Sequence, residues 1–150
     1  MINIVQICQY RYPGQVENMN ITFRQPDQEI LIATWKVPNE PQPTEQELID
    51  YGLANERAIE IDSTSRNAAP SAQHIIDATA KAKSYADGVS CASYATSSNA
   101  QWKAEAQCFI DWRDSVWNYL YQLLATLSGN QEPIPSVQEI INQLPIIVWP

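Results

Sequence analysis

Residues 108–129, CFIDWRDSVWNYLYQLLATLSG, decide the predicted fold because they combine a helical repeat with many aromatic side chains. The stretch holds two tryptophans, two tyrosines, one phenylalanine and four leucines. Its large apolar residues recur every three or four positions, which is the spacing of one face of a helix. This aromatic stripe consists of Phe109, Trp112, Val116, Leu120, Leu123 and Leu127, widened by Trp117, Tyr121 and Leu124. The sequence therefore predicts a long helix, capped by Ser98 or Asn99 and followed by a left-handed Gly129.

A second helix is predicted from residue 71, with small side chains that the aromatic stripe can pack against. Its seam repeats every three or four residues through Ile75, Ala78, Ala82, Tyr85, Val89 and Ala92. Alanines let a neighbouring helix approach closely, although each buries little apolar area. We therefore predict a long helical hairpin within residues 71–150. Pairing of the same seam between two chains is the alternative.

Residues 130–150 are predicted to form a short helix and an apolar tail. Ser136 and Glu139 have the spacing of a capping box, and Pro145 should end the helix that follows. The tail, IIVWP at 146–150, would favour aggregation if it were exposed. We expect it to be covered, either by this chain or by another.

The first forty residues are predicted to form a small antiparallel β-meander. Three stretches with β-branched side chains are typical of strands: INIVQI at 2–7, ITFRQ at 21–25 and EILIATWKV at 29–37. The PDQ sequence at 26–28 is typical of a tight turn. The predicted fold class is therefore α+β, with a β-rich unit at 1–40 followed by a mainly α-helical part.

A proline-rich connector and an acidic helix are predicted over residues 41–62. Three prolines between positions 38 and 43 stiffen the chain, and Thr44 with Glu47 forms a capping box. We expect a helix from residue 45 to about residue 61, ended by the DSTSRNAAPS sequence at 62–71. Seven carboxylates lie between positions 40 and 62. They form either a solvated face or a docking surface for a basic partner.

Composition argues against several classes of partner. The 150 residues include 17 acidic and 9 basic side chains, a formal net charge of −8. Nucleic-acid binding relies on the opposite sign, so no nucleic-acid partner is expected. No apolar run approaches the roughly 18 residues that span a membrane. Three widely spaced cysteines and the lack of an apolar leader predict folding in a reducing cytoplasm.

Catalytic and metal-binding patterns are not evident in the sequence. His74 is the sole histidine, and it lies in an ordinary position near a predicted helix start. Cys8, Cys91 and Cys108 lack the spacing of metal ligands and are interpreted as small buried side chains. Asp111 and Asp114 are expected on a solvated helix face. We therefore expect no enzyme activity, no cofactor and no metal.

The aromatic stripe is wider than one alanine-rich helix can cover. Either its rings are shared among the short helix, the tail and the β unit, or a partner protein covers the remainder. Tryptophan and tyrosine are enriched in protein interfaces. On the second interpretation the partner-binding residues are Trp112, Trp117, Tyr121 and Trp149.

Two groups of motifs give the chain a resemblance to known proteins. The first is YPG at 12–14, followed by IATWKVP at 32–38 and PQPTEQEL at 41–48. The second is W-x-x-E-A from Trp102, W-R-D-x-V-W from Trp112, P-x-x-x-E-x-x-x-x-L-P from Pro135, and the final V-W-P. Together these motifs resemble small proteins encoded in the tail-fibre regions of phages and defective prophages.

The resemblance implies a phage tail protein, for which two roles are expected. One is a tail-fibre assembly chaperone or cap that acts in the host cytoplasm and binds a fibre or baseplate protein. The other is a structural virion component that stays in the tail as an adaptor or fibre subunit. The copy number is left open between a homo-oligomer and a hetero-oligomer.

Overall fold

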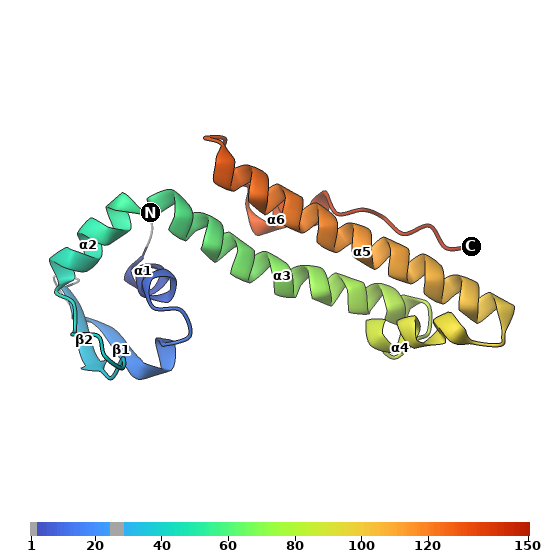
Figure 1. The fold of residues 1–150 in the computed structure, drawn as a ribbon, viewed down its shortest axis with the longest axis horizontal. Coiled ribbons are helices and arrows are strands. Elements are labelled where there is room, and N and C mark those ends of the chain that lie inside the picture. The colour runs from blue at the N-terminus through green and yellow to red at the C-terminus, as the bar shows by residue number, and fades with distance from the viewer. Residues whose placement is uncertain (1–2, 25–28) are drawn as a thin grey trace. The chain divides into compact units, whose positions relative to one another are not determined.

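The computed structural model describes residues 3–24 and 29–150, which are mainly helical (Figure 1). The chain divides into two compact units, Met1–Ser63 and Thr64–Pro150. Each unit has its own buried core. In chain order the elements are α1 (Ile4–Arg11), the 3-10 turn η1 (Val16–Asn18), β1 (Met19–Arg24), β2 (Glu29–Trp35), α2 (Glu45–Ala54), α3 (Glu56–Ala82), α4 (Gly88–Ser93), the 3-10 turn η2 (Tyr94–Thr96), α5 (Ala100–Gly129) and α6 (Val137–Asn142).

The predicted β-meander is wrong, because its first strand is the helix α1. Asn3 and Gln6 form a capping box in which each side chain bonds the other's backbone N–H at 2.9 Å. Ile4, Ile7 and Cys8 are buried at the spacing of one helix face. Within the described residues, β structure is limited to one antiparallel pair, β1 with β2. The α+β prediction is therefore replaced by a mainly helical chain, and the PDQ turn lies outside the described residues.

The core of the N-terminal unit joins α1, α2 and the start of α3. Its buried residues are Ile4, Ile7, Cys8, Tyr12, Val37, Leu48 and Ile59. Gly52 lets α2 approach α1, since a Cβ at this position would lie 2.5 Å from Cδ1 of Ile7. Trp35 at the end of β2 packs edge-on against Tyr12 at 5.0 Å and donates its indole N–H to the Glu40 carbonyl oxygen. The hairpin is thereby anchored to the helical core.

The predicted acidic helix begins at Glu45 as expected, with Thr44 and Glu47 forming the capping box. It ends earlier than predicted, because Asn55 closes α2 by donating its side-chain amide to the Tyr51 carbonyl oxygen. The expected break at 62–71 is also wrong, since α3 runs through it with Pro70 inside the helix. An interior proline costs roughly 3 kcal/mol. Burial of Ala68 and Ala72 on either side of Pro70 offsets part of that cost.

In the C-terminal unit, α3 and α5 lie side by side and antiparallel (Figure 1). The predicted seam on the first of these helices is wrong. The buried positions are Ala68, Ala72, Ile76 and Ala80, whereas Ala78 and Ala82 are exposed. These residues recur every four positions, three of them alanines, and form the ridge that meets α5.

The predicted seam also continued past the end of the helix, because α3 stops at Ala82. Ser84 takes a left-handed conformation with φ 72°. Its N–H and that of Tyr85 bond the carbonyl oxygens of Lys81 and Ala80, which is a Schellman motif. Glycine usually holds the left-handed position, so serine hid this helix end from sequence analysis.

The helix α5 buries most of the predicted stripe. Phe109, Trp112, Val116, Leu120 and Leu127 are buried, and Leu123 packs against the same core half-buried. Asn99 is its N-cap, as one of the two predictions had it. Gly129 is the last helical residue instead of the left-handed residue beyond it. The Ser136–Glu139 capping box of α6 is confirmed.

Candidate partner-binding surface

The four predicted partner-binding residues separate into two pairs in the structure. Trp112 and Trp149 contact the C-terminal segment or belong to it, whereas Trp117 and Tyr121 lie farther along α5. Trp112 is 8% exposed and donates its indole N–H to the Pro145 carbonyl oxygen at 2.8 Å. Trp149 is half-buried, with its ring parallel to that of Phe109 at 6.2 Å. This first pair fastens residues 145–150 to α5.

The C-terminal segment, residues 145–150, is covered on one side only. The Cys108 thiol donates to the Val148 carbonyl oxygen at 3.1 Å, one helical turn from the Trp112 contact. Ile147 packs against the core. Ile146 and Val148, in contrast, are 88% and 83% exposed. This chain therefore covers Ile147 and Trp149 of the tail, as expected, but it leaves Ile146 and Val148 exposed.

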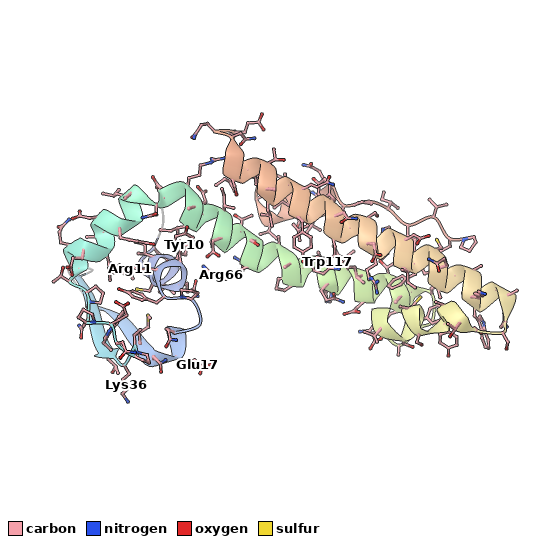
Figure 2. The ribbon with its side chains drawn as sticks, viewed as in Figure 1. Tyr10, Arg11, Glu17, Lys36, Arg66 and Trp117 are labelled. Atoms are coloured by element: carbon pink, nitrogen blue, oxygen red, sulfur yellow. The ribbon has the colours of Figure 1, made fainter. Side chains whose placement is uncertain are left out.

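Trp117 and Tyr121 form a stacked pair at the surface of the C-terminal unit. Their ring centroids are 6.0 Å apart, at an interplanar angle of 26°. Trp117 is half-buried and projects from α5 towards α3 (Figure 2). Tyr121 is 64% exposed. Because one helix holds both rings one turn apart, the pair is a preformed aromatic surface that loses little freedom on binding.

A groove lies beside Trp117, where α3, α4 and α5 meet. Its volume is about 360 Å³. The lining residues are Gln73, Ile76, Gly88, Val89, Arg113, Asp114 and Trp117. The glycine at position 88 lets α4 pack closely against α3 and α5. A Cβ at this position would lie 3.1 Å from Cγ2 of Ile76 and 3.2 Å from Cζ of Phe109. The Asp77 carboxylate fixes the same residue by accepting its N–H at 3.0 Å.

Sequence analysis missed three exposed apolar side chains of this unit. Val89 was assigned to a buried seam, yet it is 78% exposed beside Trp117. Tyr94 and Trp102 pack edge-on at 5.6 Å and are 37% and 47% exposed. Trp102 belongs to the W-x-x-E-A motif, for which the sequence predicted no role. Only the end of α3 at Ala82, which removes Val89 from the helix pair, could have indicated its exposure.

A buried polar cluster is centred on Glu105 and includes Tyr85, whose ring centroid lies 5.5 Å from that of Tyr94. The Glu105 carboxylate is 5% exposed and accepts hydrogen bonds from the Tyr85 hydroxyl at 2.8 Å and the Gln101 amide at 3.1 Å. The Lys83 ammonium lies 3.2 Å from the same carboxylate and 5.4 Å from the Trp149 ring centroid. The hydrogen bonds from Gln101 and Tyr85 hold the pKa of Glu105 below its ordinary value. Each group is matched by another, so the cluster serves the fold.

The two buried thiols are not activated nucleophiles. Cys8 and Cys91 are buried, and burial raises the pKa of the Cys91 thiol to about 11. A protonated thiol is a poor nucleophile and metal ligand. His74 lines a second groove, between α3 and α6, together with apolar residues. Among the described residues, no group of three or more His, Cys, Asp or Glu side chains could hold a metal ion.

Comparisons with protein families, with curated proteins and with solved structures found no match to this chain. None of the helices in the described ranges is long and apolar enough to cross a membrane.

Proposed function

We propose that this chain is a phage tail-fibre-associated protein, an assembly chaperone or cap that binds a fibre or baseplate protein in the host cytoplasm. The observation that carries the proposal is the stacked pair of half-buried Trp117 and exposed Tyr121, with Trp117 lining an open groove. Rigid aromatic side chains of this kind are the usual anchors of protein interfaces. The resemblance to tail-fibre-region proteins supplies the class of partner.

The role proposed is binding and not catalysis. Two charged pairs of the C-terminal unit neutralise one another: Arg113 with Asp114 and Lys83 with Glu105. Several large apolar side chains of this unit are exposed as well: Tyr121, Val89, Ile146 and Val148. Scattered apolar residues are normal on a surface, but aromatic residues beside a groove favour a protein contact.

Two of the four predicted anchors are reassigned within this proposal. Trp112 and Trp149 already have partners inside the chain, so they hold the C-terminal segment in place. Trp117 and Tyr121 remain as the residues that contact the fibre. The seam of a trimeric fibre, covered before assembly, is the surface they would occupy.

The alternative is a structural component of the virion, fixed to the fibre or baseplate through the same rings. The rigid anchoring of the aromatic pair favours a lasting contact as much as a transient one. Occupancy separates the two roles. A chaperone is absent from purified particles, whereas a structural subunit is present at a fixed ratio to the fibre protein.

Co-expression of this chain with the fibre protein of its genomic neighbourhood tests the proposal. We expect one complex on size-exclusion chromatography, with a mass that gives its stoichiometry, and fewer insoluble fibre chains than in expression without this protein. Separate elution of the two proteins, with unchanged fibre solubility, would refute both roles.

A further inference from the structure

The outer face of α2, in the N-terminal unit, carries an exposed apolar pair. Ile49 and Leu53 are 36% and 71% exposed. They lie four positions apart, so their side chains are neighbours on one face of the helix. The opposite face of α2 buries Leu48, and the described core of this unit includes neither Ile49 nor Leu53. The two side chains therefore offer an apolar contact roughly one helical turn long.

Carboxylates flank this apolar pair. The helix α2 has three acidic residues, Glu45, Glu47 and Asp50, and no lysine or arginine. Asp50 is exposed and lies three positions before Leu53, on the same side of the helix. Its carboxylate accepts a hydrogen bond from the neutral Gln46 amide at 2.8 Å, which leaves its charge in place.

Only part of this negative charge is matched within the unit. Hydrogen bonds from Thr44 lower the pKa of Glu47, and the Arg11 guanidinium adds to the effect. Glu47 is thus engaged at the start of the helix. Among the described residues, no ion pair involves Glu45 or Asp50. The face therefore presents uncompensated negative charge beside an exposed apolar pair.

We propose that this face of α2 binds an amphipathic helix of another protein, one that carries lysine or arginine beside its apolar stripe. The apolar stripe packs on Ile49 and Leu53, as the ridges of one helix fit the grooves of another, and the basic side chains lie beside Glu45 and Asp50. Charge complementarity selects this occupant. A second copy of α2 would bring like charges together, and anionic lipid would be repelled. The inference goes beyond the proposed function, because it places a second partner on the unit that lacks the stacked aromatic pair.

Two synthetic helical peptides test the selection by charge. Both carry leucines at i, i+3, i+4 and i+7, and one has flanking lysines where the other has glutamates. Fluorescence anisotropy of the labelled peptides with the full chain should give about tenfold tighter binding of the lysine peptide at low salt. The difference should shrink in about 0.5 M salt. Equal affinities, or no binding of the lysine peptide, would overturn the inference.

Asp50→Asn and Asp111→Asn test the place of binding with the same change of charge. Asp111 is also exposed and accepts a hydrogen bond from the glutamine four positions earlier, at 2.9 Å, but it lies on α5. Asp50→Asn should weaken lysine-peptide binding about fivefold, and Asp111→Asn should leave it unchanged. Equal weakening would show that the peptide responds to the net charge of −8 and not to α2, and would overturn the inference.

Leu53→Ala and Val148→Ala test the apolar part of the contact. Both residues are exposed, by 71% and 83%, so neither substitution should disturb folding, which circular dichroism checks. Leu53→Ala should weaken lysine-peptide binding about tenfold, and Val148→Ala should leave it unchanged. Unchanged binding by Leu53→Ala would place the peptide elsewhere and overturn the inference.

Two measurements on the chain alone and with the fibre protein exclude other occupants of this face. Sedimentation of the chain alone should give no dimer that depends on Leu53. A dimer that Leu53→Ala converts to monomer would overturn the inference in favour of a second copy. Leu53→Ala should also retain fibre binding, because the proposed fibre contact belongs to the other unit. Loss of fibre binding together with peptide binding would make the fibre the occupant of α2 and overturn the inference of a second partner.

Discussion

The Trp112 indole N–H donates a hydrogen bond to the carbonyl oxygen of Pro145 at 2.8 Å, across 33 residues of sequence. One turn earlier on α5, Cys108 makes the corresponding contact with Val148. Both hydrogen bonds are made to backbone carbonyl oxygens of the C-terminal segment and not to its side chains. A residue predicted to bind a partner is thus used to hold the chain's own segment.

We expect Trp112→Phe to lower the free energy of unfolding by about 1–3 kcal/mol, because the substitution leaves the Pro145 carbonyl without its donor and shrinks a buried ring. Urea denaturation measures the loss. Faster proteolysis within residues 145–150 should accompany it. Trp102→Phe is the control, since Trp102 is 47% exposed and its loss should cost under about 0.5 kcal/mol. Similar losses from both would contradict the role of Trp112 in holding residues 145–150 against α5.

Gly88 and Gly129 provide a matched pair of glycine-to-alanine substitutions. A Cβ at Gly88 would crowd Ile76, Asp77 and Phe109 at 3.1–3.2 Å, and two of those side chains are fully buried and cannot give way. Gly88→Ala should therefore destabilise the chain by about 1–3 kcal/mol. Gly129 has nothing within 4 Å and ends α5, so Gly129→Ala should stabilise by up to about 1 kcal/mol. Thermal unfolding measures the change in stability of each variant. Equal changes would show that the close packing of α4 against Ile76 and Phe109 does not require a glycine at position 88.

Local signals allowed part of the fold to be predicted from the sequence. The caps at Thr44, Asn99 and Ser136 depend on residues two or three positions away, and the structure confirms all three. The aromatic stripe on α5 could be predicted for the same reason, because its repeat of three or four residues is a local pattern. The cap of α1 was missed because Asn3 and Gln6 replace the usual Ser or Thr and Glu.

Tertiary contacts explain what sequence analysis got wrong. Pro70 predicts a helix end, but packing of Ala68 and Ala72 keeps α3 continuous around it. The place of the candidate site depends on similar long-range effects. The period of α5 separates Trp112, which belongs to the buried repeat, from Trp117, which only widens it. The hydrogen bond of Trp112 to Pro145 depends on the course of the C-terminal segment, and no pattern within α5 could have predicted it.

Stability should decline in acid through Glu105. Its folded-state pKa lies below the ordinary 4.5, so the stability it contributes is present above pH 4.5 and is lost as the pH falls through the lowered value. Denaturation from pH 7 to pH 3 measures this dependence. Glu105→Gln should be less stable at pH 7 and less sensitive to acid. Asp111→Asn, on an exposed part of the same helix, is the control and should retain the wild-type profile; an unchanged profile for Glu105→Gln would exclude this group as the source.

The last prediction separates binding from folding at the aromatic pair. Tyr121 is 64% exposed, so Tyr121→Ala should cost under about 0.5 kcal/mol of stability while weakening fibre binding by about 2 kcal/mol, or roughly thirtyfold. Trp117→Ala should reduce fibre co-purification more than it reduces thermal stability, although its half-buried ring makes some loss of stability unavoidable.

Calorimetric titration against the fibre protein and thermal unfolding supply the two measurements on each variant. Leu53→Ala is the control, because Leu53 is a 71% exposed apolar residue of the other unit and its removal should change neither quantity. If Trp117→Ala loses stability and binding in equal measure, Trp117 belongs to the core. Unchanged binding by Tyr121→Ala would then leave the stacked pair without a role at the interface. Removal of an exposed ring that contacts the partner must lower the affinity for the partner more than it lowers the free energy of unfolding.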